Sequence, residues 1–193
     1  MTVITKRDAA RRQLDAAIRL FFWADDLIVV HSLASTAANL YSDLVEQTTT
    51  SSSWRKRFGN DGERAEREIR SILNHAWNFF KHADHDATED LAFDEEQSEL
   101  MLFYATLECS ELEPTSDEMQ LFQLWFLSTG RLELELSGDI KAAAVALFPN
   151  LSSLSRIEQV ARGRARLNAL LHANRDAYVR CFMPPLFDPP TAR

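Results

Sequence analysis

The segment from Asn74 to Asp86 carries the densest group of side chains able to act as acids, bases or ligands: three of the five histidines and two aspartates. Imidazoles titrate near neutral pH and serve in acid–base catalysis or as metal ligands. A helix turns by about 100° per residue, which places His75, Asn78 and His82 within about 60° of one another. Arg70 lies about 140° from His75 on the same wheel. The candidate catalytic residues are His82, Asn78 and His75, with Arg70 as a fourth that an ideal helix holds apart.

The end of the same segment also offers metal ligands. Imidazole nitrogens and carboxylate oxygens suit zinc, manganese or iron, and the candidate ligands here are His82, Asp84, His85 and Asp86. Contiguous ligands at a helix end rarely enclose one ion without a further ligand from another helix. No HxxxH or ExxH pair elsewhere in the sequence supplies that ligand. A metal site in the His75–Asp86 cluster is therefore one of three interpretations.

A second interpretation needs no ligand at all. His82, Asp84 and Asp86 could end the helix and begin a turn, while His75 and Asn78 bond to neighbouring backbone. Polar clusters at helix ends often satisfy free carbonyl groups in this way. The cluster would then be structural.

The third interpretation rests on a resemblance. The pattern Asn78-x-x-x-His82-x-Asp84 at a helix end resembles the signature helix of the HEPN superfamily, small helical bundles found in toxins, phage-defence ribonucleases and nucleotide-binding proteins. The resemblance implies a metal-independent ribonuclease site at a dimer interface, where the histidine positions a phosphate and activates a ribose 2′-hydroxyl. In that family an arginine precedes the polar residue, and Trp77 stands at its position here. An alternative match, Arg70-x-x-x-x-His75, needs a distorted helix.

The resemblance therefore implies binding of a nucleotide, RNA or a protein partner, without efficient nuclease activity. In that reading Asn78 and His82 orient a phosphate or ribose and Asp84 fixes the tautomer of His82. Lys81 or Arg70 supplies the positive charge. The stretch NFFKHAD, residues 78–84, is also similar to a segment of uncharacterised bacterial proteins, which implies no function.

Apolar residues recurring every three and four positions predict the helices that position this segment. The segment ends a helix predicted over 63–82, whose buried face is formed by Ile69, Ile72, Leu73, Ala76, Phe80 and Ala83. Six more helices are predicted over 6–22, from 25 or 26 to 45, 96–111, 115–130, 139–148 and 153–182. Residues 48–62, which begin with six hydroxyl side chains, show no sustained period and predict a loop.

Two helix starts show the spacing of a capping box, in which a hydroxyl and a carboxylate three residues apart satisfy free amides. These pairs are Thr115 with Glu118 and Ser155 with Glu158. Only 5 Gly and 6 Pro occur, few of the residues that separate strands. We expect an all-α fold, a single bundle of about six or seven helices over 1–183, with an extended proline-rich tail over 184–193.

The charge distribution constrains the partners. The net charge of −8 argues against a general nucleic-acid coat, which needs clustered Lys and Arg. No Lys or Arg occurs between residues 83 and 130, whereas basic residues cluster over 6–19, 55–70 and 156–180. Complementary packing between helices or between subunits explains this polarity, and a basic groove for an anion is the other explanation. A non-enzymatic homodimeric interaction or regulatory protein is the alternative function.

The cysteines, the lengths of the apolar runs and the absence of cofactor motifs in the sequence indicate the cellular location and the cofactor requirement. Cys109 and Cys181 lie in apolar helix faces, where buried thiols behave as small hydrophobic groups. With no apolar run near the roughly 20 residues that span a bilayer, we expect a cytoplasmic protein without membrane contact. No cofactor motif is present, so no cofactor is expected. His31 and His172 are isolated in amphipathic helices, and we assign them no role.

Overall fold

The computed structural model describes residues 2–24, 26–59, 63–82, 84, 88–132 and 137–173. Within these ranges the chain forms helices and no β-strand, which confirms the predicted all-α fold. The elements are α1 (Lys6–Phe22), α2 (Leu27–Thr48), α3 (Trp54–Phe58), α4 (Glu63–Lys81), α5 (Glu95–Ser110), α6 (Asp117–Ser128), α7 (Gly138–Leu147), the 3-10 helix η1 (Leu151–Ser153) and α8 (Arg156–Ala173).

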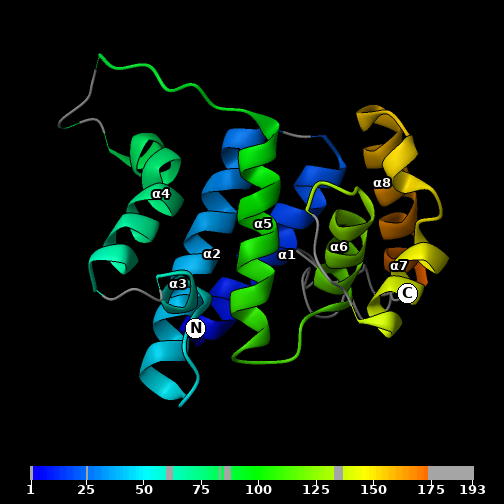
Figure 1. Ribbon diagram of the computed structural model, residues 1–193. Helices are drawn as coiled ribbons and strands as arrows, with labels where there is room; N and C mark the ends of the chain where they lie inside the picture. The colour runs from blue at the N-terminus through cyan, green and yellow to red at the C-terminus, as the bar shows by residue number, and fades with distance from the viewer. Residues whose placement is uncertain are drawn as a thin grey trace, which may run out of the picture.

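The helices α1, α2 and α5 form the middle of the molecule, with α4 on one side and α6, α7 and α8 on the other (Figure 1). A short turn joins α1 to α2, and Asp26 caps α2 by accepting the N–H of Ile28 at 2.8 Å. Helix α5 runs in the same direction as α2. Ser98 donates to the Leu27 carbonyl at 3.3 Å near the two helix starts, and Ser42 donates to Glu108 at 2.8 Å further along.

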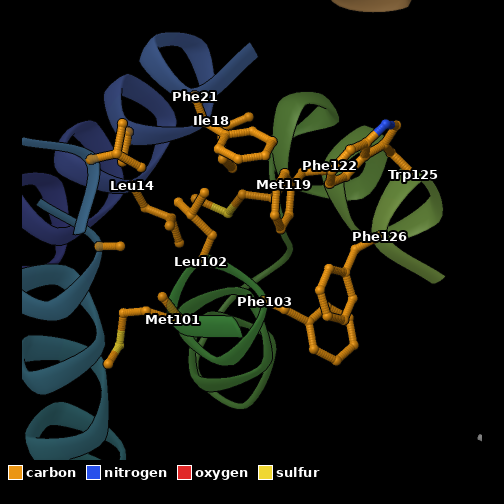
Figure 2. Packing of buried hydrophobic residues seen from close by; sticks show 14 of the residues in the cluster. Leu14, Ile18, Phe21, Met101, Leu102, Phe103, Met119, Phe122, Trp125 and Phe126 are labelled. Atoms are coloured by element: carbon orange, nitrogen blue, oxygen red, sulfur yellow. The ribbon is translucent and has the colours of Figure 1, made fainter. Parts of the chain in front are cut away.

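Burial of large apolar side chains from α1, α5 and α6 forms the core, because removing such surface from water is the main favourable term in folding. Figure 2 shows most of these side chains gathered between the three helices, with Met101 pointing away from the others: Leu14, Ile18, Phe21, Met101, Leu102, Phe103, Met119, Phe122, Trp125 and Phe126. Helix α8 closes this core at Gly163, which lies directly against the ring of Phe22. A β-carbon at Gly163 would come within 2.6 Å of Phe22 Cδ1, so the close approach requires glycine.

The predicted loop over 48–62 contains a helix that the sequence analysis missed, so the described chain has eight α-helices rather than six or seven. Helix α3 begins at the Ser53 cap, whose hydroxyl accepts the N–H of Lys56 at 3.3 Å. Its Arg55 is buried and forms ion pairs with Asp43 at 3.1 Å and Glu46 at 3.3 Å. Because these partners come from α2, residues 48–62 alone do not reveal the helix.

One predicted capping box is wrong and the other is supported. The cap of α6 is Ser116, not Thr115, and its hydroxyl accepts the N–H of Met119 at 3.2 Å. Glu118 is not available to a box because it pairs with Arg19 of α1 at 2.9 Å. In the first turn of α8, Glu158 accepts from both the N–H and the hydroxyl of Ser155, at 2.9 and 2.6 Å.

The acidic middle of the sequence pairs with the basic helices inside one chain. Arg57 of α3 forms two hydrogen bonds of 2.7 Å with Glu111, and Arg156 of α8 pairs with Glu95 at 3.0 Å. The prediction of complementary packing between helices is thus confirmed.

Four predictions about the end of the chain fall on residues 174–193, which the structure does not describe: the last part of the final helix over 174–182, the setting of Cys181, the boundary at 183 and the proline-rich tail over 184–193. Across the described helices, none combines the length and the apolar character that crossing a bilayer requires.

Candidate functional site

Helix α4 carries the residues that the sequence analysis selected, and it packs antiparallel to α2. Asn39 of α2 donates to the side-chain carbonyl of Asn74 at 2.9 Å, and the ring of Phe80 lies 5.9 Å from that of His31 near the start of α2. Ala76 is buried on this contact face. The opposite face of α4 is exposed.

The four candidate catalytic residues are all exposed: Arg70, His75 and Asn78 on α4, and His82 directly after its last residue. Two of them are joined by a backbone hydrogen bond of the helical type, in which the His82 N–H donates to the Asn78 carbonyl at 3.0 Å. Among the described residues, no hydrogen bond or ion pair from another helix reaches the side chains of His75, Asn78 or His82. The chain therefore places these three along one exposed flank and does not enclose them.

The candidate binding residues lie at the end of α4. The Lys81 ammonium sits 4.1 Å from the centroid of the Trp77 ring, a cation–π contact. Trp77 occupies the arginine position of the HEPN pattern, so a cation is present beside that position although the arginine is not. Asp84 lies just beyond the last helical residue and is exposed.

The metal hypothesis finds no assembled site. In the part of the chain that the structure describes, no three His, Cys, Asp or Glu side chains come together as ligands. His82 and Asp84 are described and exposed, whereas His85 and Asp86 lie outside the described residues.

A groove of about 510 Å³ lies between α4, α2 and α5, beside the predicted site. We call it the α4 groove. Of the predicted residues, His75 reaches it. Its lining joins apolar side chains to a few hydrogen-bonding ones: His31, Ser71, Ile72, Leu73, His75, Ala76, Gln97, Leu100 and Met101.

His31, on the α2 wall of this groove, is the residue that sequence reasoning missed. Its side chain is buried, with 3% of the residue exposed, and its ring packs edge to face against Phe80 and Phe93 at 5.9 and 5.1 Å. Neither ring nitrogen has a hydrogen-bond partner of ordinary geometry. Burial lowers the pKa of His31 to about 4, and the nearby Gln97 backbone opposes that shift. The imidazole is therefore neutral at neutral pH.

The sequence did contain a signal for this position. Residues 27, 31, 34, 38, 41 and 45 of α2 follow alternating spacings of four and three, the pattern of a buried seam. Five of these positions hold Leu, Ala, Tyr or Val, and His31 is the exception. A histidine on a buried seam needs a hydrogen-bond partner, because an unsatisfied buried polar group costs about 1–3 kcal/mol.

A second buried polar cluster has a structural role. Glu99 of α5 is fully buried, 2.9 Å from Arg131, and also pairs with Arg156 of α8. Burial raises the pKa of Glu99 to about 7, and the two arginines oppose that shift. The Arg156 guanidinium stacks over the Trp125 ring at 4.9 Å. The cluster joins α5 to α8 inside the core.

The described part of the chain defines an all-α helical protein with an open, largely apolar groove beside one peripheral helix. Comparison with protein-family models, curated proteins and solved structures finds no match. The groove and the exposed flank of α4 are therefore the features of the described chain that bear on its function.

Proposed function

We propose that this chain is a non-enzymatic binding protein that takes a small molecule into the α4 groove. The observation that carries the proposal is His31, a buried and neutral imidazole on the groove wall. Neither of its nitrogens has a hydrogen-bond partner of ordinary geometry, although the Gln97 backbone interacts with the ring. More than nine in ten buried polar groups in proteins are satisfied. Other described residues also have buried polar atoms without a partner, but of these residues only His31 lines the α4 groove, where a ligand could supply the partner.

The size and lining of the groove support this function. Ligand sites have volumes of roughly 300–1,000 Å³ and are mainly apolar with a few placed polar groups, and the α4 groove of about 510 Å³ falls within that range. Ile72 and Leu100 border the groove and are 71% and 46% exposed. A bound molecule would remove part of this apolar surface from water.

Catalysis has less support than binding. A nucleophile or general base normally has an orienting partner within hydrogen-bond reach. His75, Asn78 and His82 share a flank, but none of them has such a partner from another helix among the described residues.

The test is a bulky substitution that fills the groove, compared with the same substitution at an exposed position outside the groove. Leu100→Trp, on the groove wall, should weaken binding of the neutral dye Nile red at least roughly tenfold, which is about 1.4 kcal/mol, as followed by dye fluorescence. Val145→Trp replaces a 59% exposed residue of α7 that does not line the groove and should leave binding unchanged. Equal affinity in both variants would remove the groove as the binding site.

A second candidate function is binding of RNA or a nucleotide by the end of α4. The observation that favours it is the Lys81 ammonium held over Trp77, close along the helix to the exposed Asn78 and His82. A cation held there can meet a phosphate.

Its test is the affinity of a short single-stranded RNA. His82→Ala should weaken binding severalfold, and His172→Ala, at an exposed histidine of α8, should not. Unchanged RNA binding and cleavage in His82→Ala would rule the function out. The homodimeric alternative stays a prediction; two of the acid–base pairs, Arg19 with Glu118 and Arg57 with Glu111, lie within one chain.

A further inference from the structure

The chemistry of the α4 groove restricts what it can hold, and this restriction rests on the proposed binding function. Among the residues that the structure describes, its lining contains no Arg, Lys, Asp or Glu. A charged ligand would lose its hydration without gaining a counter-charge, which is costly. An anion such as a nucleotide phosphate is therefore a poor occupant, and an uncharged molecule is favoured.

The buried imidazole specifies the polar part of the ligand. A neutral imidazole has one N–H donor and one acceptor nitrogen. A hydroxyl group can donate or accept, so it satisfies whichever nitrogen it reaches. The Phe80 and Phe93 rings pack edge to face against His31 and lie 5.1 Å from each other, so the three rings form one cluster that restricts the orientation of the imidazole.

The remaining lining specifies the apolar part. Ile72, Leu73, Leu100 and Met101 present aliphatic and thioether groups along the groove, and a methionine adapts to aromatic or aliphatic bodies alike. Ser71, His75 and Gln97 complete the lining with neutral or weakly basic polar groups.

We propose that the α4 groove binds an uncharged small molecule with an apolar body and a hydroxyl group, and that the hydroxyl forms a hydrogen bond with His31. His31 is then a binding residue that sets specificity, and the apolar walls supply most of the affinity.

The experiment compares three probes that share one apolar body: 4-propylphenol, propylbenzene and 4-propylbenzoate. Binding to the full chain is followed by NMR of the Ile72, Leu100 and Met101 methyl groups, and the His31 ring nitrogens are observed in the same samples. We expect 4-propylphenol to bind at least roughly fivefold more tightly than either other probe, which corresponds to one net hydrogen bond of about 1 kcal/mol. Only this probe should shift the His31 nitrogen resonances.

Two variants extend the comparison. His31→Leu should reduce the affinity for 4-propylphenol to that for propylbenzene, and His31→Gln, which keeps a donor and an acceptor, should retain part of the preference. The wild-type comparison stands even if a variant does not fold. Tighter or equal binding of propylbenzene or 4-propylbenzoate would overturn the ligand class and leave the binding function intact. Failure of all three probes to move the groove methyl groups would overturn both.

Discussion

His31 shows how much one side chain can depend on surroundings that lie far away in the sequence. It belongs to α2, but its burial depends on Phe80 at the end of α4 and on Phe93 ahead of α5. Those two rings remove the imidazole from water, which lowers its pKa to about 4. In the unfolded chain the same group titrates near 6.5.

This shift predicts a pH dependence of stability with a definite sign. Between pH 6.5 and 4 the His31 imidazole binds a proton in the unfolded state but not in the folded state. The free energy of unfolding therefore falls as the pH falls. Relative to His31→Gln, the wild type should lose about 1–2 kcal/mol between pH 7 and pH 5, measured by urea unfolding at both values.

The control for this measurement is His172→Gln, which removes an exposed histidine from α8. It should change stability by the same amount at both pH values, or not at all. If wild type and His31→Gln lost stability in parallel between pH 7 and pH 5, His31 would not be the neutral buried group that the groove argument requires.

Among the elements, the approach of α8 to α1 depends most on a single residue. Gly163 lies against Phe22, whose ring is fully buried and packs on Trp125 with 5.2 Å between centroids. The Arg164 side chain also donates to the Phe22 carbonyl at 2.6 Å, which holds α8 at this distance. The ring has little room to move.

Gly163→Ala should therefore destabilise the protein by about 1–3 kcal/mol, because overpacking outweighs the better helix propensity of alanine. Gly138→Ala is the matched control: it also replaces a helical glycine, but a β-carbon there meets nothing within 4 Å. Thermal unfolding of both variants measures the difference. A Gly163→Ala protein as stable as Gly138→Ala would contradict the packing of α8 on Phe22.

The helices that sequence reasoning predicted correctly are those whose signals are local. The range predicted for α1 coincides with the observed one, and Asp26 caps α2 as expected, because apolar spacing and a capping side chain are contained in each segment. Helix α3 and the Ser116 cap were missed for a different reason. Their stability depends on partners in other helices, such as Asp43 for Arg55 and Asp15 for Ser116.

The candidate site was predictable to a similar extent. The sequence selected His75 from a dense polar cluster, and His75 does line the groove. It placed Ile72 on the buried face of its helix, which is wrong, because Ile72 is 71% exposed. That exposure and the 46% exposure of Leu100 depend on how α4 sits against α2 and α5. His31 lay on a buried seam, but one sequence does not show that its nitrogens would lack partners.

At the scale of the whole molecule, buried carboxylates connect helices that are distant in the chain. One Glu108 oxygen accepts from Ser42 at 2.8 Å, from Tyr104 at 2.6 Å and from the Arg55 N–H at 3.1 Å. This single group ties α2, α3 and α5 together, and Glu99 does the same for α5 and α8. The acidic middle of the sequence is therefore an internal framework for the fold.

Helix α4 stands apart from this framework, since it packs mainly on α2 and α3 (Figure 1). A molecule in the α4 groove would contact α4 and α5 at once and supply an interface that the bare helices make only in part. Occupancy and the docking of α4 would then be thermodynamically linked, since a ligand that binds the docked state stabilises it by mass action. Ligand occupancy would then set how stably α4 is docked on the rest of the protein. A partner that binds only docked or only undocked α4 would respond to the ligand.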